Sequence, residues 1–184
     1  PFVMYAYYSL TEQIYTAEEI VMDGTITSIA FNYASSTAFS MGGVQVYLKH
    51  TDKNKFDSDT DMVPVGAEDK VFEGTFSATG AGWVTIELDT PFEYDGNSNL
   101  LVCCFDPTNG SFGNYYKFYC SDISEDYRCH FAFSDYVVPS LEVSNTANSF
   151  RAYDRSMIRF NIYSGTFSKP DNLTLSSCTE KEAT

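Results

Sequence analysis

The chain has 184 residues, and its 25 Asp and Glu against 11 Lys and Arg give a formal net charge of −14. This balance excludes general binding to nucleic-acid backbones, which needs basic patches, and with no run of about 18 apolar residues it also predicts no membrane insertion. Hydrophobic residues make up 43% of the chain and aromatic residues 16%, enough apolar surface to build a core, so intrinsic disorder is excluded as well.

Alternating apolar and polar residues predict β-strands along most of the chain, separated by Gly, Asp, Asn and Pro. Near the start, Leu10–Val21 makes a poor helical stripe and is interpreted as a strand or extended arm. The strands predicted after it are Thr25–Ala34, Val44–His50, Val71–Phe76, Trp83–Leu88, Asn99–Asp106, Tyr115–Cys120, Cys129–Phe133 and Ile158–Tyr163. Asn99–Asp106 is apolar on both faces, which indicates a central strand.

Eight or nine strands of this length need two sheets or a barrel. Long polar loops favour a Greek-key or jelly-roll sandwich, so we predict one all-β jelly-roll sandwich over residues 1–167. The composition changes at Lys169-Pro170, and residues 168–184 are interpreted as a linker and the truncated start of another domain. Because the chain begins without Met, we expect a mature form or an excised fragment.

Strand alternation singles out aromatic side chains that point away from the apolar face of their strand. Sugars stack on exposed rings, so these are candidate glycan-binding residues: Trp83, Tyr115 and Tyr119, with Tyr47 as a further exposed aromatic. The alternative is that a second layer covers them, or that they are ordinary scattered surface aromatics. Arg159 also faces outward, where we expect it to pair with a carboxylate; an anionic glycan is its other candidate partner.

The sequence Asp57-Ser58-Asp59-Thr60-Asp61 spaces three carboxylates as calcium ligands often are, so a structural calcium ion is predicted at Asp57, Asp59 and Asp61. Met62 stands where an EF-hand loop has Gly, which excludes that motif. The alternative is a solvated acidic loop between strands.

No catalytic centre is predicted, and we expect the domain not to be an enzyme. The chain has two histidines: His50 is interpreted as a rim residue, and His130 diverges from its neighbour Cys129 in a strand. Cys120 and Cys129 either close a disulfide or remain free thiols, and the spacing leaves both open.

A series of segments in order resembles a lectin-like, adhesin-like sandwich module of secreted and surface proteins of Bacteroidetes-type bacteria. They are Tyr8–Ile20, Gly24–Phe31, Val46–Thr51, Phe56–Val65, Val71–Gly74, Gly82–Gly96, Asn99–Val102 and Ile158–Ile162. The likeness covers roughly residues 7–184, and the module usually has Trp where Met62 stands. It implies a galactose-binding-like jelly-roll, commonly beside peptidase or hydrolase domains and followed by fibronectin type III repeats. Residues 168–184 would then be a linker and the truncated start of such a repeat.

The resemblance implies a secreted or cell-surface accessory module that binds carbohydrate or host glycoprotein. Its partners would be a glycan or glycoprotein and the other domains of a parent protein. The alternative is a structural, protein–protein spacer that supports a neighbouring peptidase or hydrolase, and a stand-alone hydrolase is a third possibility. Clustered exposed rings would favour glycan binding, and buried rings would favour the spacer.

Overall fold

The computed structural model describes residues 1–110, 116–122, 126–144 and 148–165, and it is an antiparallel all-β sandwich. The predicted fold class is therefore confirmed, whereas the jelly-roll connectivity stays a prediction. The segment predicted to open a second domain, residues 168–184, lies outside the described residues.

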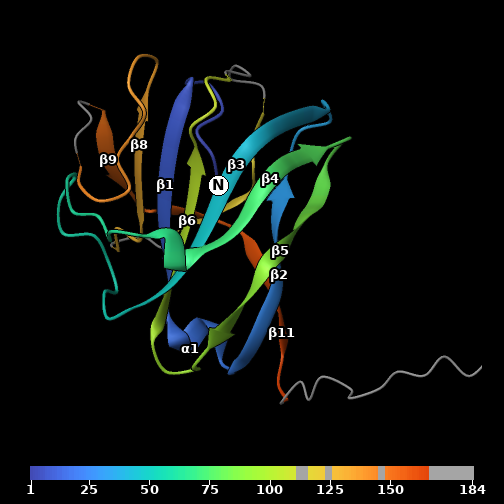
Figure 1. Cartoon of the computed structure of the whole chain (residues 1–184), viewed down its shortest axis with the longest axis vertical. Coiled ribbons are helices and arrows are strands. Elements are labelled where there is room, and N and C mark those ends of the chain that lie inside the picture. Colours follow the sequence, from blue (N-terminus) through green and yellow to red (C-terminus); the bar gives the residue numbers. More distant parts are fainter. Residues whose placement is uncertain (111–115, 123–125, 145–147, 166–184) are drawn as a thin grey trace, which may run out of the picture.

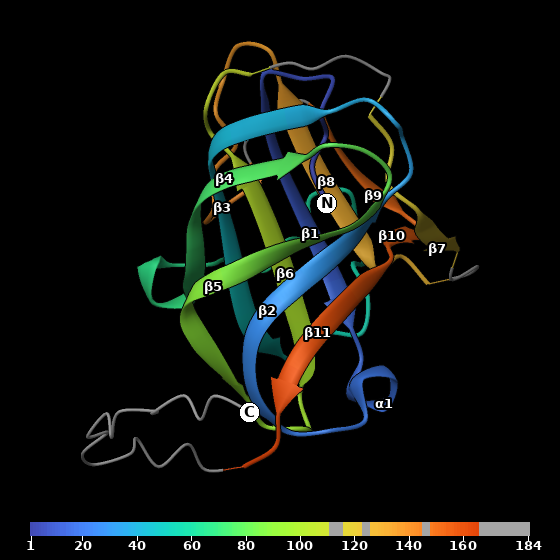
Figure 2. The ribbon, with the colours of Figure 1, turned by 90° about the vertical axis from the view of Figure 1, so that its right-hand side faces the viewer.

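Two sheets form the layers of the sandwich (Figures 1 and 2). The larger sheet has the strand order β4 (Lys70–Ala78), β3 (Phe39–Thr51), β6 (Asn99–Asp106), β1 (Tyr8–Tyr15), β8 (Cys129–Ser134) and β9 (Ser149–Ala152). The smaller sheet has the order β11 (Ile158–Tyr163), β2 (Gly24–Tyr33) and β5 (Gly82–Tyr94). Strands β4 and β5 follow one another in the chain and so connect the two layers.

The remaining elements are short. Strands β7 (Cys120–Asp122) and β10 (Asp154–Ser156) pair in a two-stranded sheet, and a 3₁₀ turn covers Ala67–Asp69. Helix α1 (Ala17–Ile20) interrupts the predicted extended arm, because the Thr16 N–H donates to the Glu19 carboxylate (2.8 Å) and starts a helical turn. In the described part of the chain, no helix is long and apolar enough to cross a bilayer.

The predicted strands match the observed ones except near two loops. The predicted strand Tyr115–Cys120 is wrong over its described part: Phe118 forms an isolated bridge to Tyr33, and β7 begins only at Cys120. Strands β9 and β10 lie in a region that the sequence indicates as loop. Both strands are short and paired at sheet edges. Their alternation of apolar and polar residues is therefore too short to predict a strand from the sequence.

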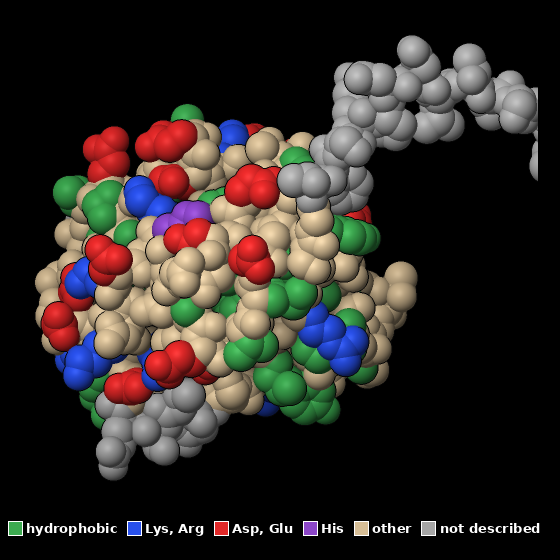
Figure 3. All heavy atoms as spheres, turned by 90° about the horizontal axis from the view of Figure 1, so that it is seen from below, with side chains coloured by type: hydrophobic (Ala, Val, Ile, Leu, Met, Phe, Trp, Pro, Cys, Tyr) green, Lys and Arg blue, Asp and Glu red, His purple; other side chains and the backbone are tan. Residues whose placement is uncertain are grey.

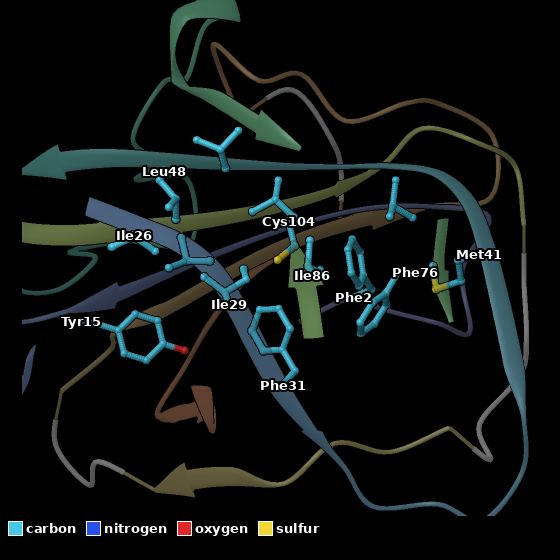
Figure 4. Packing of buried hydrophobic residues seen from close by; sticks show 14 of the residues in the cluster. Phe2, Tyr15, Ile26, Ile29, Phe31, Met41, Leu48, Phe76, Ile86 and Cys104 are labelled. Carbon is cyan, nitrogen blue, oxygen red and sulfur yellow. The ribbon is translucent and has the colours of Figure 1, made fainter. Parts of the chain in front are cut away.

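The main core lies between the two sheets. Val44, Val46 and Leu48 of β3 are completely buried, as alternation predicts, and they face Ile26 and Ile29 of β2. Figure 4 shows labelled side chains of both layers pointing toward one another across this space. Val84 and Leu88 of β5, and Ile158, Phe160 and Ile162 of β11, pack against the same cluster and are partly buried.

A second core covers the opposite face of the larger sheet. Leu10, Ile14, Tyr47, Leu101, Cys103 and Phe105 project from β1, β3 and β6 into this cluster. The loop after β3 folds over them and inserts Phe56 and Val65, which are 0% and 4% exposed. The prediction that Tyr47 is an exposed aromatic is therefore wrong: Tyr47 is 4% exposed because this loop covers it.

We predict that Phe56→Ala lowers the free energy of unfolding by about 3–5 kcal/mol, because it leaves a cavity under the loop. Urea unfolding measures the loss. Thr60→Ala, in the same loop but exposed, is the matched control and should change stability by less than about 0.5 kcal/mol. Equal, small effects of both variants would contradict a packed loop.

Candidate functional site

The outer face of the smaller sheet carries a shallow hollow of about 390 Å³. Its floor is made by Ser28 and Ala30, two small residues of the central strand β2 that point away from the core. They are 5% and 7% exposed because taller side chains on β5 and β11 stand over them. In Figure 2 this face is turned to the viewer, and no other described element crosses β2 and β11.

Register places the taller side chains in rows across the sheet. Ala30 lies between Thr85 on β5 and Arg159 on β11, and Ser28 lies between Glu87 and Asn161. Trp83, one row further along, pairs with Asn32. The hollow thus combines one indole ring with hydroxyl, amide, carboxylate and guanidinium groups, which can form hydrogen bonds with a polar ligand.

Two of the sequence-predicted ligand residues are in direct contact. The Arg159 guanidinium lies over the Trp83 ring at 3.9 Å from its centroid. Since the two residues belong to strands on opposite sides of β2, this stack bridges the central strand above Ala30. A bulkier residue at position 30 would stand in the way of the stack, so the small side chain of Ala30 is part of the site.

Tyr119 lies beside this hollow. Its backbone N–H donates to the Asn32 carbonyl (2.8 Å), so it extends the row that contains Trp83. Phe118 packs against the core, which leaves Tyr119 on the outer side, 53% exposed. The remaining ligand prediction, Tyr115, lies outside the described residues.

The expectation that Arg159 pairs with a carboxylate is wrong for the described residues. The other arginines do pair: Arg128 with Asp126 (2.9 Å), Arg151 with Asp59 (3.3 Å) and Arg155 with Glu19 (2.8 Å). The contact of Arg159 is instead the cation–π stack on Trp83, and none of the described carboxylates is within ion-pair distance of it.

The three carboxylates at calcium-like spacing point to different partners. Asp61 accepts from Lys53 Nζ (2.8 Å) and from the Asp57 N–H (2.8 Å), whereas Asp59 accepts from the Arg151 N–H (3.0 Å). Among described residues, no group of three His, Cys, Asp or Glu side chains converges on one point. A calcium ion here stays a prediction, and binding would require Asp59 and Asp61 to turn away from their cations.

On the end of the sandwich that carries α1, the acidic charge is not gathered at one place (Figure 3). Seen from the end of the sandwich that carries α1, Asp and Glu side chains alternate with Lys and Arg side chains (Figure 3). Glu19, in α1, illustrates the pattern, because its hydrogen bonds from Arg155 lower the pKa of the carboxyl to about 2. Six of the described carboxylates are paired with Lys or Arg in this way: Glu19, Asp59, Asp61, Asp69, Glu73 and Asp126.

A buried hydrogen-bonded chain runs under the loop after β3. Glu12 Oε2 is 2.8 Å from His130 Nδ1, and His130 Nε2 is 2.7 Å from Ser149 Oγ. Glu12 also accepts the Val63 N–H (2.9 Å), which ties the loop to the sheet. Burial raises the pKa of the Glu12 carboxyl, although hydrogen bonds from His130 and Val63 act against that shift.

This chain has the connectivity of a hydrolase triad, but its three side chains are 0%, 1% and 9% exposed. The contacts join the loop to the sheet, since Glu12 of β1 also accepts the Val63 N–H. The sequence contains one signal for it: Glu12 shares its strand face with Leu10 and Ile14, so a carboxylate between two core residues indicates a buried partner.

Cys120 and Cys129 are free thiols in this structure. Both border a cavity of about 490 Å³ on the inner side of β1 and β8, together with Thr11, Gln13 and Phe131. Burial raises the pKa of Cys129 to about 12, so this thiol is protonated at neutral pH and is a weak nucleophile.

A comparison with protein-family models and a comparison with curated proteins both gave no match for the chain. Its function is therefore inferred from the geometry above.

We predict that Asp61→Asn lowers the free energy of unfolding by about 1 kcal/mol at pH 7. Burial alone raises the pKa of Asp61, but the Asp57 N–H and the Lys53 ammonium outweigh burial and lower it below the ordinary 3.8. A lowered folded-state pKa stabilises the protein above the unfolded-state value, and this contribution disappears as the pH falls through the folded-state value.

Urea titrations between pH 7 and pH 2 measure the difference between the wild type and Asp61→Asn. The two stabilities should converge below about pH 3. Asp52→Asn is the control, since this exposed carboxylate has no ion-pair partner among the described residues. A difference that persists unchanged at the lowest pH would show that the carboxylate charge is not the cause.

Proposed function

We propose that this domain is a non-catalytic accessory module that binds carbohydrate or host glycoprotein. The observation that carries the proposal is the hollow on the smaller sheet, where Trp83 stands at the rim of a floor made by Ser28 and Ala30. Sugars present apolar C–H faces and a ring of hydroxyls, which such a mixture of indole and polar side chains can contact.

The polar groups of the hollow suit sugar hydroxyls. Thr85 can donate and accept, and Glu87 accepts. Asn161 offers its side-chain carbonyl, because its Nδ2 donates to Thr27 Oγ1 and to the Tyr163 hydroxyl (both 3.4 Å). All of them project from β-strands rather than from loops, so the face is preformed and little ordering accompanies binding. Tyr119 at the end of the Trp83 row offers a second ring for an adjoining sugar unit.

The sequence resemblance supports a role for the module within a larger protein. We propose that it belongs to a secreted or surface bacterial protein, with a jelly-roll connectivity, a neighbouring peptidase or hydrolase domain and fibronectin type III repeats after it. In that setting the module would hold the parent protein on its target, in the manner of an adhesin.

A second candidate function is a protein–protein spacer, and one surface favours it. At the end of the larger sheet, Phe150 of β9 stacks near Phe131 and Phe133 of β8 and is 43% exposed. Tyr5, 49% exposed, packs edge-on against Phe133. Exposed aromatic groups beside an edge strand are suited to contact a neighbouring domain.

We predict that Trp83→Ala weakens glycan binding by about 2 kcal/mol, a roughly 30-fold loss, because the ring supplies the apolar contact. A glycan array identifies the bound sugar, and calorimetry on that sugar measures the loss. Tyr136→Ala, which truncates an aromatic side chain 91% exposed elsewhere on the surface, is the matched control and should bind as the wild type does.

Absence of binding on the array would reject the carbohydrate-binding function and leave the spacer. If Trp83→Ala leaves the affinity for the sugar unchanged, the sugar binds somewhere other than this sheet face. Circular dichroism of each variant confirms that the fold is intact before affinities are compared.

Calcium at Asp57, Asp59 and Asp61 is a separate proposal, supported by their spacing in the sequence. If calcium binds the native state, thermal melting in excess CaCl₂ should occur several degrees above melting in EDTA, and Asp57→Asn should abolish the difference. Identical melting temperatures in CaCl₂ and in EDTA would show that the native domain does not bind calcium.

A further inference from the structure

We propose that the ligand of this sheet face is an acidic sugar, one that carries a carboxylate or a sulfate, and that Arg159 binds the anionic group. The inference rests on the proposed carbohydrate-binding function and names the class of sugar that the face would take. It is carried by the state of the Arg159 side chain, which differs from that of every other arginine in the chain.

The other arginines are used inside the fold. Arg155 is 6% exposed and donates to both Glu19 oxygens (2.9 and 2.8 Å), and Arg128 lies 3.3 Å from the same carboxylate. Arg151 donates to Asp59 and to the Phe56 carbonyl. In a chain with 25 acidic residues, an arginine that forms no ion pair with a carboxylate is unusual. Among the described residues, Arg159 has no carboxylate partner.

The stack on Trp83 fixes the guanidinium and leaves its donors available. A cation–π contact uses the flat face of the guanidinium, whereas its N–H groups point outward in the plane. None of the residues that the structure describes accepts a hydrogen bond from these N–H groups. A planar fork of free donors held in one orientation matches the two oxygens of a carboxylate or sulfate.

The surroundings of Arg159 limit the ligand to a modest charge. Ala30 lies below the stack and adds no charge, and Asn161, two residues along β11, can contact ring hydroxyls. Glu87 stands in the same hollow, one row from Arg159, where it can accept hydroxyl protons but repels a second anionic group. The net charge of −14 repels polyanions as well, so we expect one anionic group per bound unit.

Calorimetry of the whole chain with matched sugars tests the inference. The probes are lactose, 3′-sialyllactose and 3′-sulfolactose, together with digalacturonate and its neutral counterpart galactobiose, all at one salt concentration. We expect an acidic sugar to bind at least ten-fold more tightly than its neutral partner. The sialylated and sulfated arms distinguish a carboxylate from a sulfate as the preferred group.

Variants assign the preference to Arg159. Arg159→Gln should abolish the preference for the acidic over the neutral sugar, while Arg159→Lys, a point charge without the fork, should keep only part of that preference. Lys117→Gln removes the same charge from an exposed residue outside the hollow and is the matched control, with the preference unchanged.

Two failures are distinguishable. If the wild type binds acidic and neutral sugars equally, or if Arg159→Gln keeps the preference, the inference is overturned while carbohydrate binding stands. If the wild type binds none of the probes and nothing on a glycan array, the proposed function falls and the inference with it. Because Arg159 is exposed, we expect its variants to melt as the wild type does, which thermal unfolding checks.

Discussion

The constraint on which the rest of the structure depends is that the central strands of the larger sheet are apolar on both faces. In β6, Leu100, Val102 and Cys104 face one side while Leu101, Cys103 and Phe105 face the other. Each large apolar side chain gains about 1.5–3 kcal/mol on burial, so both faces need a cover. The smaller sheet covers one face, and the loop after β3 covers the other. The outer face of the smaller sheet needs no such cover and stays open, because its outward residues in the hollow, apart from Trp83, are small or polar: Ser28, Ala30, Thr85, Glu87, Arg159 and Asn161.

The polar groups under the loop explain where part of the acidic charge goes. Glu12 with His130, Asp59 with Arg151 and Asp61 with Lys53 each join the loop to the sheet or to itself. Carboxylates used in this way have their lone pairs directed at protein donors. The same spacing that suggests an ion site therefore serves a covering loop, and the two roles compete for the same oxygens.

The outer face of the smaller sheet is hollow because the side chains of β2 are smaller than those of its neighbours β5 and β11. Small side chains on β2 form a floor, and larger ones on β5 and β11 form the walls. Since strands within a sheet are rigid relative to loops, such a hollow exists before any ligand arrives. The Arg159–Trp83 stack adds an oriented cation to it, in a molecule whose other described arginines already have carboxylate partners.

The sequence by itself determined the fold class, most strands and the direction of side chains along each strand. Alternation predicted correctly that Val46 and Leu48 point inward and that Trp83 points the other way. It assigned Tyr47 and Trp83 to the same exposed class, yet Tyr47 is covered by the loop that carries Phe56. Helix α1 and the pairing of Glu12 with His130 also escaped it, because both depend on short or distant contacts. Alternation decides which side of a strand a residue is on, whereas only the tertiary structure decides whether that side is covered. The difference is physical, since periodicity is a local property of the backbone and burial depends on segments far away in the chain.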